Sequence, residues 1–189
     1  MIVKHPITSP LLSHPDYTPI ETTSRQRLPT DENGFFAGTL ATATTIPHVQ
    51  TLTYNKLVPL ASSGVELEVE SAWRTPLEPP DILMLLSLAT PGLSGHPGLA
   101  HGGLLATVID EAMSLALEAH SQIVSSFFTA QLDVRYLAPV PVPSVAVVRA
   151  KVVSRAGRKN TVRAEILDNG RICVEALGVW IEKRQTHKI

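Results

Sequence analysis

The order of strand-like segments around one long helix-like segment constrains the fold of this chain most strongly. Residues 103–120 are small and apolar with a helical period. Four strand-like segments follow, at 127–138, 144–155, 160–168 and 172–182. The short sequences AGRKN and DNGR form tight turns between neighbouring strands, which favours an antiparallel meander. No crossover helix separates these strands, so the pattern predicts an α+β fold with one helix against an antiparallel sheet.

Strand-like segments also precede the predicted helix. They lie at 49–60, 65–73 and 82–89, and the last is an apolar run typical of a buried strand. In the segment 65–73, three apolar residues alternate with glutamates, which predicts a half-buried strand with an acidic outer face. The buried side chains of that strand would be Val65, Leu67 and Val69.

The first part of the chain has a different character. Residues 1–32 are rich in proline, serine, threonine and histidine without periodicity, and we expect an irregular extension there. Residues 33–47 predict a short helix followed by a turn, anchored by three apolar side chains. Those anchors would be Phe35, Phe36 and Leu40.

Composition excludes several classes of protein. The chain has 189 residues, 44% of them hydrophobic, and a formal net charge of −1, so we expect a globular domain without a nucleic-acid or anionic-membrane partner. The apolar runs fall short of the roughly 20 residues of a membrane span. We also expect no secretory signal and no transit peptide. The single cysteine, Cys173, favours a packed thiol in a reducing compartment, which we take as the cytoplasm with a mitochondrial location left open.

The predicted helix has one polar stripe, and one aspartate lies at its edge. At 100° per residue, Thr107, Glu111, Ser114 and Glu118 share that stripe. Glu111 and Glu118 are interpreted as solvated. Asp110 borders small apolar residues, and partial desolvation would raise its pKa and strengthen it as a base. The alternative is an exposed carboxylate with no chemical role. The opposite face, which we expect to pack on the sheet, comprises Leu105, Val108, Ile109, Ala112, Leu115 and Ala116.

The helix opens with His101-Gly102-Gly103. Backbone N–H groups at a helix N-terminus lack internal partners and carry partial positive charge, so they can form an oxyanion hole. Alternatively, the glycines only permit a turn and close packing. Gly102 and Asp110 are eight residues apart, or about 12 Å along a helix, too far to contact one carbonyl group. If they cooperate, they come from two chains, which predicts a homodimer with a twofold axis.

The motif HGGLLATVIDEAM, with His101 nine residues before Asp110, resembles the hotdog-fold acyl-CoA thioesterases. The branch it resembles contains the phenylacetate-pathway thioesterases and the human thioesterase superfamily members. The longer string GHPGLAHGGLLATVIDEAM is similar to fungal members of that group, and the strand ending in RYLAPV extends the likeness. The resemblance implies a curved antiparallel sheet wrapped around one central helix, with active sites between two subunits. On this basis residues 1–48 are an N-terminal extension and 49–189 a hotdog thioesterase-like domain.

The resemblance also implies roles for individual residues. Asp110 matches the catalytic carboxylate, acting as general base or as nucleophile. The N–H of Gly102 matches the oxyanion donor, and His101 matches the histidine that shapes the loop. Thr129 matches a position that orients the attacking water. Some relatives carry Asn or Gln six residues before the histidine; here that residue is Gly95, and the neighbouring His96 is the candidate replacement.

The coenzyme A end of the substrate is predicted at another turn. Arg155, Arg158 and Lys159 surround Gly157, and three cations suit a nucleotide phosphate. The alternative is an ordinary solvated hairpin. His96 and His101 lack a metal-ligand cluster around them, so no metal is expected. No cofactor is expected either, apart from coenzyme A as part of the substrate.

These patterns predict hydrolysis of an acyl-CoA thioester to a free acid and coenzyme A by a homodimer or tetramer. Two alternatives stay open. The same fold can release an acyl or polyketide chain from a carrier protein, and a non-catalytic hotdog dimer can bind acyl ligands or a protein partner. The sequence does not fix the length of the acyl chain.

Overall fold

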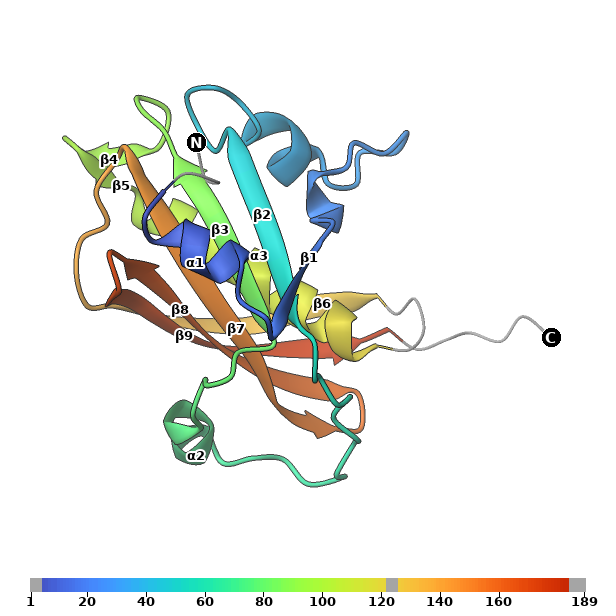
Figure 1. The fold of residues 1–189 in the computed structure, drawn as a ribbon. Helices are drawn as coiled ribbons and strands as arrows, with labels where there is room; N and C mark the ends of the chain where they lie inside the picture. Colours follow the sequence, from blue (N-terminus) through green and yellow to red (C-terminus); the bar gives the residue numbers. More distant parts are fainter. Residues whose placement is uncertain (1–4, 122–125, 184–189) are drawn as a thin grey trace.

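A computed structural model of the chain describes residues 5–121 and 126–183 and shows a large sheet crossed by one long helix (Figure 1). The elements are α1 (Thr8–Leu12), β1 (Tyr17–Ile20), η2 (Thr23–Arg25), η3 (Gly34–Thr39), β2 (His48–Tyr54), α2 (Val69–Arg74), β3 (Ile82–Leu88), β4 (Ser94–His96), β5 (Leu99–Ala100), α3 (Gly102–His120), β6 (Phe127–Tyr136), β7 (Ser144–Ala156), β8 (Lys159–Asp168) and β9 (Arg171–Glu182).

Seven strands form one antiparallel sheet in the order β1-β2-β3-β7-β8-β9-β6. The helix α3 lies against one face of this sheet, behind it in Figure 1. The predicted α+β hotdog architecture is therefore confirmed. The meander is confirmed for β7, β8 and β9, but β6 lies beyond β9 at the edge, so the prediction was wrong for β6.

The main core lies between α3 and the sheet, and we call that sheet face the inner face. All seven residues of β3 are buried, as its apolar run predicts. The predicted sheet-facing side of α3 is confirmed, since all six of its residues are buried. Cys173 is buried as expected, at 2% exposure. In β9, Gly178 lies where an added Cβ atom would overlap the buried Trp180 indole, so the core needs glycine there.

The opposite face of the sheet, the outer face, has a smaller apolar cluster of its own. Leu52, Leu83, Leu85 and Val147 are its buried members. Leu11 and Leu12 of α1 pack against them, so α1 covers this face and is in front of the sheet in Figure 1.

The two predicted tight turns between neighbouring strands contain Gly157 and Gly170, both with positive φ, as the sequence predicts.

Two predictions for the N-terminal part were wrong. Residues 1–32 are not irregular throughout, because α1, η2 and β1 form there and β1 pairs with β2. The predicted short helix at 33–47 is present as η3, and Phe36 and Leu40 are buried, but Phe35 is 58% exposed and is no anchor. Residues 1–4 lie outside the described residues.

The strand predicted at 65–73 was also wrong. Residues 65–68 have no regular structure and α2 follows them. The three alternating side chains are all exposed: Val65, Leu67 and Val69. The segment contacts the sheet through other groups, since Lys159 pairs with Glu66 and the Arg135 guanidinium stacks 3.7 Å above the Trp73 ring. Among residues 5–121 and 126–183, no helix is long and apolar enough to cross a membrane.

Candidate active site at the central helix

His101 caps the N-terminus of α3. Nδ1 of His101 accepts a hydrogen bond from the N–H of Gly103 at 2.9 Å. In the described chain, no hydrogen bond uses the N–H of Gly102. This N–H carries the partial positive charge of a helix N-terminus, so it is available to a developing oxyanion.

Close packing explains the glycine that departs from the family pattern. A Cβ atom at Gly95 would lie 2.9 Å from Cδ2 and 3.0 Å from Cα of His101. An Asn or Gln side chain at this position would therefore displace the cap of α3. The amide donor that some relatives place here is incompatible with this packing of His101.

A hollow opens beside Gly102 at the same end of α3. Its lining includes His96, Leu105, Tyr136 and Leu137. The Tyr136 hydroxyl donates to the carbonyl oxygen of Gly102 at 2.9 Å, and Tyr136 is 53% exposed. Tyr136 lies in the strand predicted at 127–138 but was not predicted as a site residue. The sequence RYLAPV, which places this tyrosine at the end of β6, is the signal that marks it.

Asp110 meets Thr129 on the exposed side of α3. The Thr129 hydroxyl donates to Oδ1 of Asp110 at 3.0 Å. Burial raises the pKa of Asp110 above its ordinary value, and the hydrogen bond from Thr129 lowers it in part. The structure therefore brings together the predicted base and the predicted orienting residue from two different elements. A half-desolvated carboxylate of this kind is suited to accept a proton.

The acidic stripe of α3 is not simply solvated, which corrects the expectation for Glu111. Glu111 is half-buried, and burial raises its pKa; the Ser24 hydroxyl offsets part of that shift. Glu118 stays exposed and accepts a hydrogen bond from Thr23 at 3.1 Å. The N-terminal extension thus covers one side of the stripe through η2.

Asp110 and Gly102 are not brought together within one chain. Both belong to α3, eight residues and about 12 Å apart along the axis. The strand β6, which carries Thr129, is an edge strand of ten residues, and among the described residues no strand pairs with its outer edge. A long exposed edge invites pairing with another strand.

The predicted cations lie at the β7–β8 turn and already have protein partners. Lys159 pairs with Glu66 at 2.6 Å, and Arg155 donates to Asn160 at 3.0 Å. Arg158 is exposed and donates to the carbonyl oxygen of Glu182. The N–H of Gly157 donates to Ser62 at 2.8 Å. Neither Asp110 nor Gly102 shares a hydrogen bond with this turn. Within the described ranges, no group of three or more His, Cys, Asp or Glu residues is placed to hold a metal ion.

The sheet, the central helix and the histidine-capped helix N-terminus define a hotdog fold. Residues 97–174 match the family model of the Thioesterase superfamily. The resemblance seen in the sequence is therefore confirmed, and the matched segment contains the cap, α3, Asp110 and β6 to β8 in full.

Curated relatives carry related names. The chain is 34% identical over 94 residues to the acyl-coenzyme A thioesterase THEM4 of Bos taurus, covering 49% of this chain and 37% of that protein. It is 36% identical over 92 residues to THEM4 of Mus musculus, covering 48% and 38%. The uncharacterized mitochondrial membrane protein FMP10 of Saccharomyces cerevisiae is 35% identical over 78 residues, covering 40% and 32%. The chain thus spans less than two fifths of these relatives' length.

Solved structures support the fold. A thioesterase superfamily protein superposes with a TM-score of 0.51 at 23% identity, covering 71% of this chain and 54% of the other. A hypothetical thioesterase of Streptococcus pneumoniae, solved with coenzyme A, gives a TM-score of 0.51 at 19% identity, covering 55% and 82%.

Proposed function

We propose that the chain hydrolyses an acyl-CoA thioester to a free acid and coenzyme A. The observation that carries this proposal is the hydrogen bond between Thr129 and the half-buried carboxylate of Asp110. The names of the THEM4 relatives and the coenzyme A in the Streptococcus pneumoniae structure support the substrate class.

In the proposed reaction, Asp110 promotes attack on the thioester carbonyl carbon by one of two routes. As a general base it accepts a proton from water while the water oxygen bonds to that carbon. The C–S bond then breaks, the acid is released, and the thiolate of coenzyme A takes up a proton. As a nucleophile, Asp110 would instead form an anhydride that water opens. A single turnover in H₂¹⁸O that labels Asp110 identifies the nucleophile route, because water that opens the anhydride at the Asp110 carbonyl carbon leaves its oxygen there. The general-base route places ¹⁸O only in the product acid.

The carbonyl oxygen needs a donor that Asp110's own chain does not place nearby. We propose that the N–H of Gly102 from a second subunit supplies it, in a homodimer formed along the free edge of β6. His101 fixes the helix N-terminus, and Thr129 orients the carboxylate and the water. His96, which lines the hollow beside Gly102, is the second candidate donor.

The β7–β8 turn remains our proposed contact for the coenzyme A phosphates. Arg158 is its exposed cation, while Arg155 and Lys159 would have to exchange protein partners for phosphate oxygens. Gly157 leaves the turn unobstructed, since no atom lies within 4 Å of where its Cβ would be.

The test is release of free thiol from a panel of short, long and aromatic acyl-CoAs, with the same acyl groups on a carrier protein in parallel. Turnover of acyl-CoA supports the proposal. Turnover of only the carrier-bound substrates replaces it with chain release from a carrier. Binding of acyl-CoA without turnover of either substrate replaces it with a non-catalytic binding dimer. The compartment in which the protein acts is a separate prediction: the cytoplasm, with a mitochondrial location left open.

A further inference from the structure

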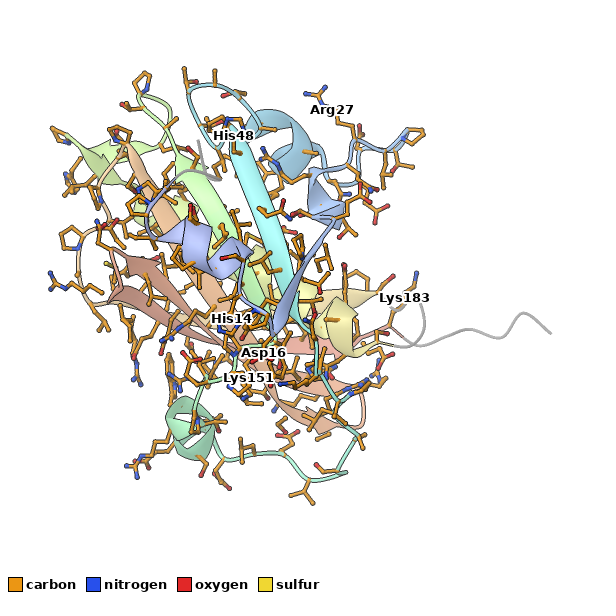
Figure 2. All side chains as sticks on the ribbon, in the orientation of Figure 1. His14, Asp16, Arg27, His48, Lys151 and Lys183 are labelled. Carbon is orange, nitrogen blue, oxygen red and sulfur yellow. The ribbon has the colours of Figure 1, made fainter. Side chains whose placement is uncertain are left out.

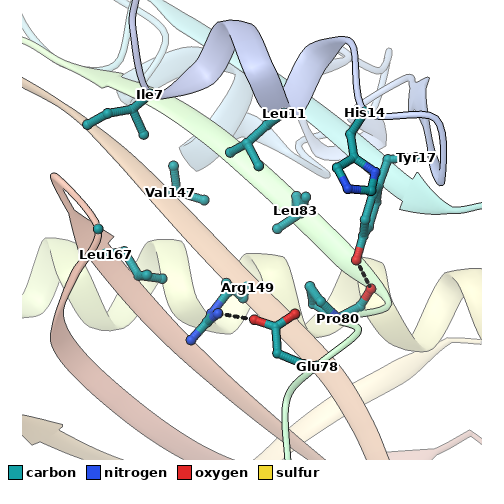
Figure 3. Close-up of a pocket in the computed structure, with 11 residues that line it drawn as sticks. Ile7, Leu11, His14, Tyr17, Glu78, Pro80, Leu83, Val147, Arg149 and Leu167 are labelled. Atoms are coloured by element: carbon teal, nitrogen blue, oxygen red, sulfur yellow. Dashed lines mark hydrogen bonds and ion pairs between the residues drawn. The ribbon is translucent and has the colours of Figure 1, made fainter.

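A pocket lies on the outer face of the sheet, on the side opposite α3 (Figure 3). The helix α1 forms its upper wall, and β3, β7 and β8 contribute to its floor. Its volume is about 300 Å³, at the lower end of the roughly 300–1,000 Å³ of small-molecule pockets. A ligand that fits it is small.

The walls are mostly apolar. Ile7, at the N-cap of α1, and Leu11 of α1 face the sheet across the cavity (Figure 3). The sheet residues opposite them are Leu83, Val147 and Leu167. Leu83 and Val147 are 4% and 6% exposed and belong to the outer-face cluster, so the floor is formed by packed side chains. Such a surface favours an aliphatic or aromatic tail.

One end of the pocket is charged. The guanidinium of Arg149 pairs with Glu165, whose side chain is 7% exposed, and with Glu78, whose side chain is 67% exposed. An anionic ligand could therefore displace the Glu78 carboxylate from Arg149 more easily than that of Glu165. Glu165 is fixed in the sheet, whereas Glu78 lies on the loop after α2 and reaches Arg149 from solvent. Exposed pairs of this kind contribute little stability.

Without the Glu78 carboxylate, this end of the pocket carries an excess of positive charge. Lys151 and Arg163 lie beside it: Lys151 donates to the backbone carbonyl of Glu78, and Arg163 pairs with Glu165. Glu175, opposite Glu165 in the register of β8 and β9, lies on the same face, so three cations would then face two carboxylates. At this same end, His14 stacks on Tyr17, whose hydroxyl donates to the carbonyl oxygen of Pro80, two residues from Glu78 (Figure 3). His14 and Lys151 are labelled close together in the view of Figure 2.

We propose that the outer-face pocket binds a small monocarboxylate with an apolar tail. The tail lies between α1 and the sheet, and the carboxylate replaces that of Glu78 on Arg149. An anion is favoured over a neutral or cationic headgroup because the exchange restores the charge balance. This site is separated from Asp110 by the sheet, so it does not depend on the proposed hydrolysis.

Calorimetric titration of the full chain with octanoate tests the proposal, with octanol and octyltrimethylammonium as neutral and cationic controls. We expect octanoate to bind more tightly than either. Glu78→Gln removes the competing carboxylate and should tighten octanoate binding about two- to fivefold, the equivalent of a weak exposed ion pair.

Two matched substitutions locate the site. Leu11→Trp fills the outer-face pocket and should abolish octanoate binding, whereas Leu137→Trp fills the hollow beside Gly102 and should leave it unchanged. Loss of binding in Leu137→Trp alone would assign octanoate to the candidate active site and overturn the proposal. Absence of octanoate binding, or equal binding of octanoate and octanol with no effect of Glu78→Gln, would also overturn it.

Discussion

Oγ1 of Thr129 lies 3.0 Å from Oδ1 of Asp110, so an edge strand and the central helix meet at a half-buried carboxylate. The two influences on this carboxylate oppose each other. Burial raises its pKa, and the hydrogen bond from Thr129 lowers it. Changing either one should therefore move the pH at which the protein becomes active.

Thr129→Val removes the hydrogen bond that favours the ionised form of Asp110. The pKa of Asp110 should rise, and the acidic limb of the kcat/KM profile should move to higher pH, because the base is active only when ionised. Thr129→Ser should restore the wild-type profile. Thr53→Val, on the distant strand β2, is the matched control. An unshifted limb in Thr129→Val would contradict the coupling.

Asp110→Asn should lower kcat by about 10²-fold or more, the scale of losing a general base. The amide oxygen can still accept from Thr129, so the melting temperature should change little. Glu111→Gln, the adjacent acid on the same helix, should keep near wild-type kcat. Steady-state thiol release at saturating acyl-CoA measures both. Equal losses in the two variants would indicate a general electrostatic effect instead of a specific base.

Glu111→Gln should also stabilise the fold above acidic pH. Burial raises the pKa of Glu111, and the charges of Asp110 and Glu118 raise it further. The folded state therefore binds this proton more tightly than the unfolded state, and stability contributed by the protonated form is lost as pH rises through the folded pKa. Glutamine stays neutral, so the melting temperature at pH 7.5 should increase by about 1–4 °C, with the gain vanishing toward pH 4.

The matched control for this stability change is Glu70→Gln on α2. Glu70 is 77% exposed in a pair with Arg74, and such pairs contribute little. Its melting temperature should stay within about 1 °C of wild type. A Glu111→Gln variant that is less stable at neutral pH would show that the ionised carboxylate is favoured in the folded chain.

Gly95→Asn tests whether the family's amide donor can be restored. The new side chain would displace His101 from the cap of α3, because a Cβ atom at position 95 meets both the ring and the backbone of that residue. We expect kcat to fall about 10-fold, on the scale of disturbing an oxyanion donor. Gly98→Asn is the control: its φ of +71° suits asparagine and its Cβ meets no atom within 4 Å. A higher kcat in Gly95→Asn would refute this interpretation.

The sequence correctly predicts the elements in which one burial pattern continues over the whole length, namely α3 and β3. Every predicted sheet-facing residue of α3 is buried, and the apolar run of β3 lies entirely inside. Both segments repeat a single pattern over many residues, and burial of that pattern dominates other contributions.

Short or composite patterns are less informative. The pattern at residues 65–69 alternates like that of a strand, with apolar side chains at Val65, Leu67 and Val69. Within the described structure this segment pairs with no strand, and these three side chains are exposed. The segment instead contacts the sheet through Glu66 and Trp73. The sequence around residues 65–73 does not indicate partners as distant as Lys159 and Arg135. The covering of Glu111 by η2 was missed for the same reason, since the two are more than 80 residues apart.

The sequence predicted individual residues of the candidate site but not the hydrogen bonds that join them. His101, Gly102 and Asp110 follow from one contiguous motif, whereas the hydrogen bond from Tyr136 to Gly102 joins α3 to the end of β6. Tyr136 ends the edge strand β6, where a tyrosine ring can line a hollow while its hydroxyl binds the helix.

The most direct test of the central claim, a hydrolytic site shared by two subunits, is complementation between Asp110→Asn and Gly102→Ala. A Cβ atom added at Gly102 meets only ordinary contacts with the Tyr136 ring, 3.5 Å away, so the second variant should fold. Each variant alone should release thiol from acyl-CoA slowly. Unfolded together and refolded as mixed dimers, they should regain about one quarter of wild-type activity, because half of the dimers contain one intact site of two. Activity no higher than the average of the two separate variants would contradict a shared site.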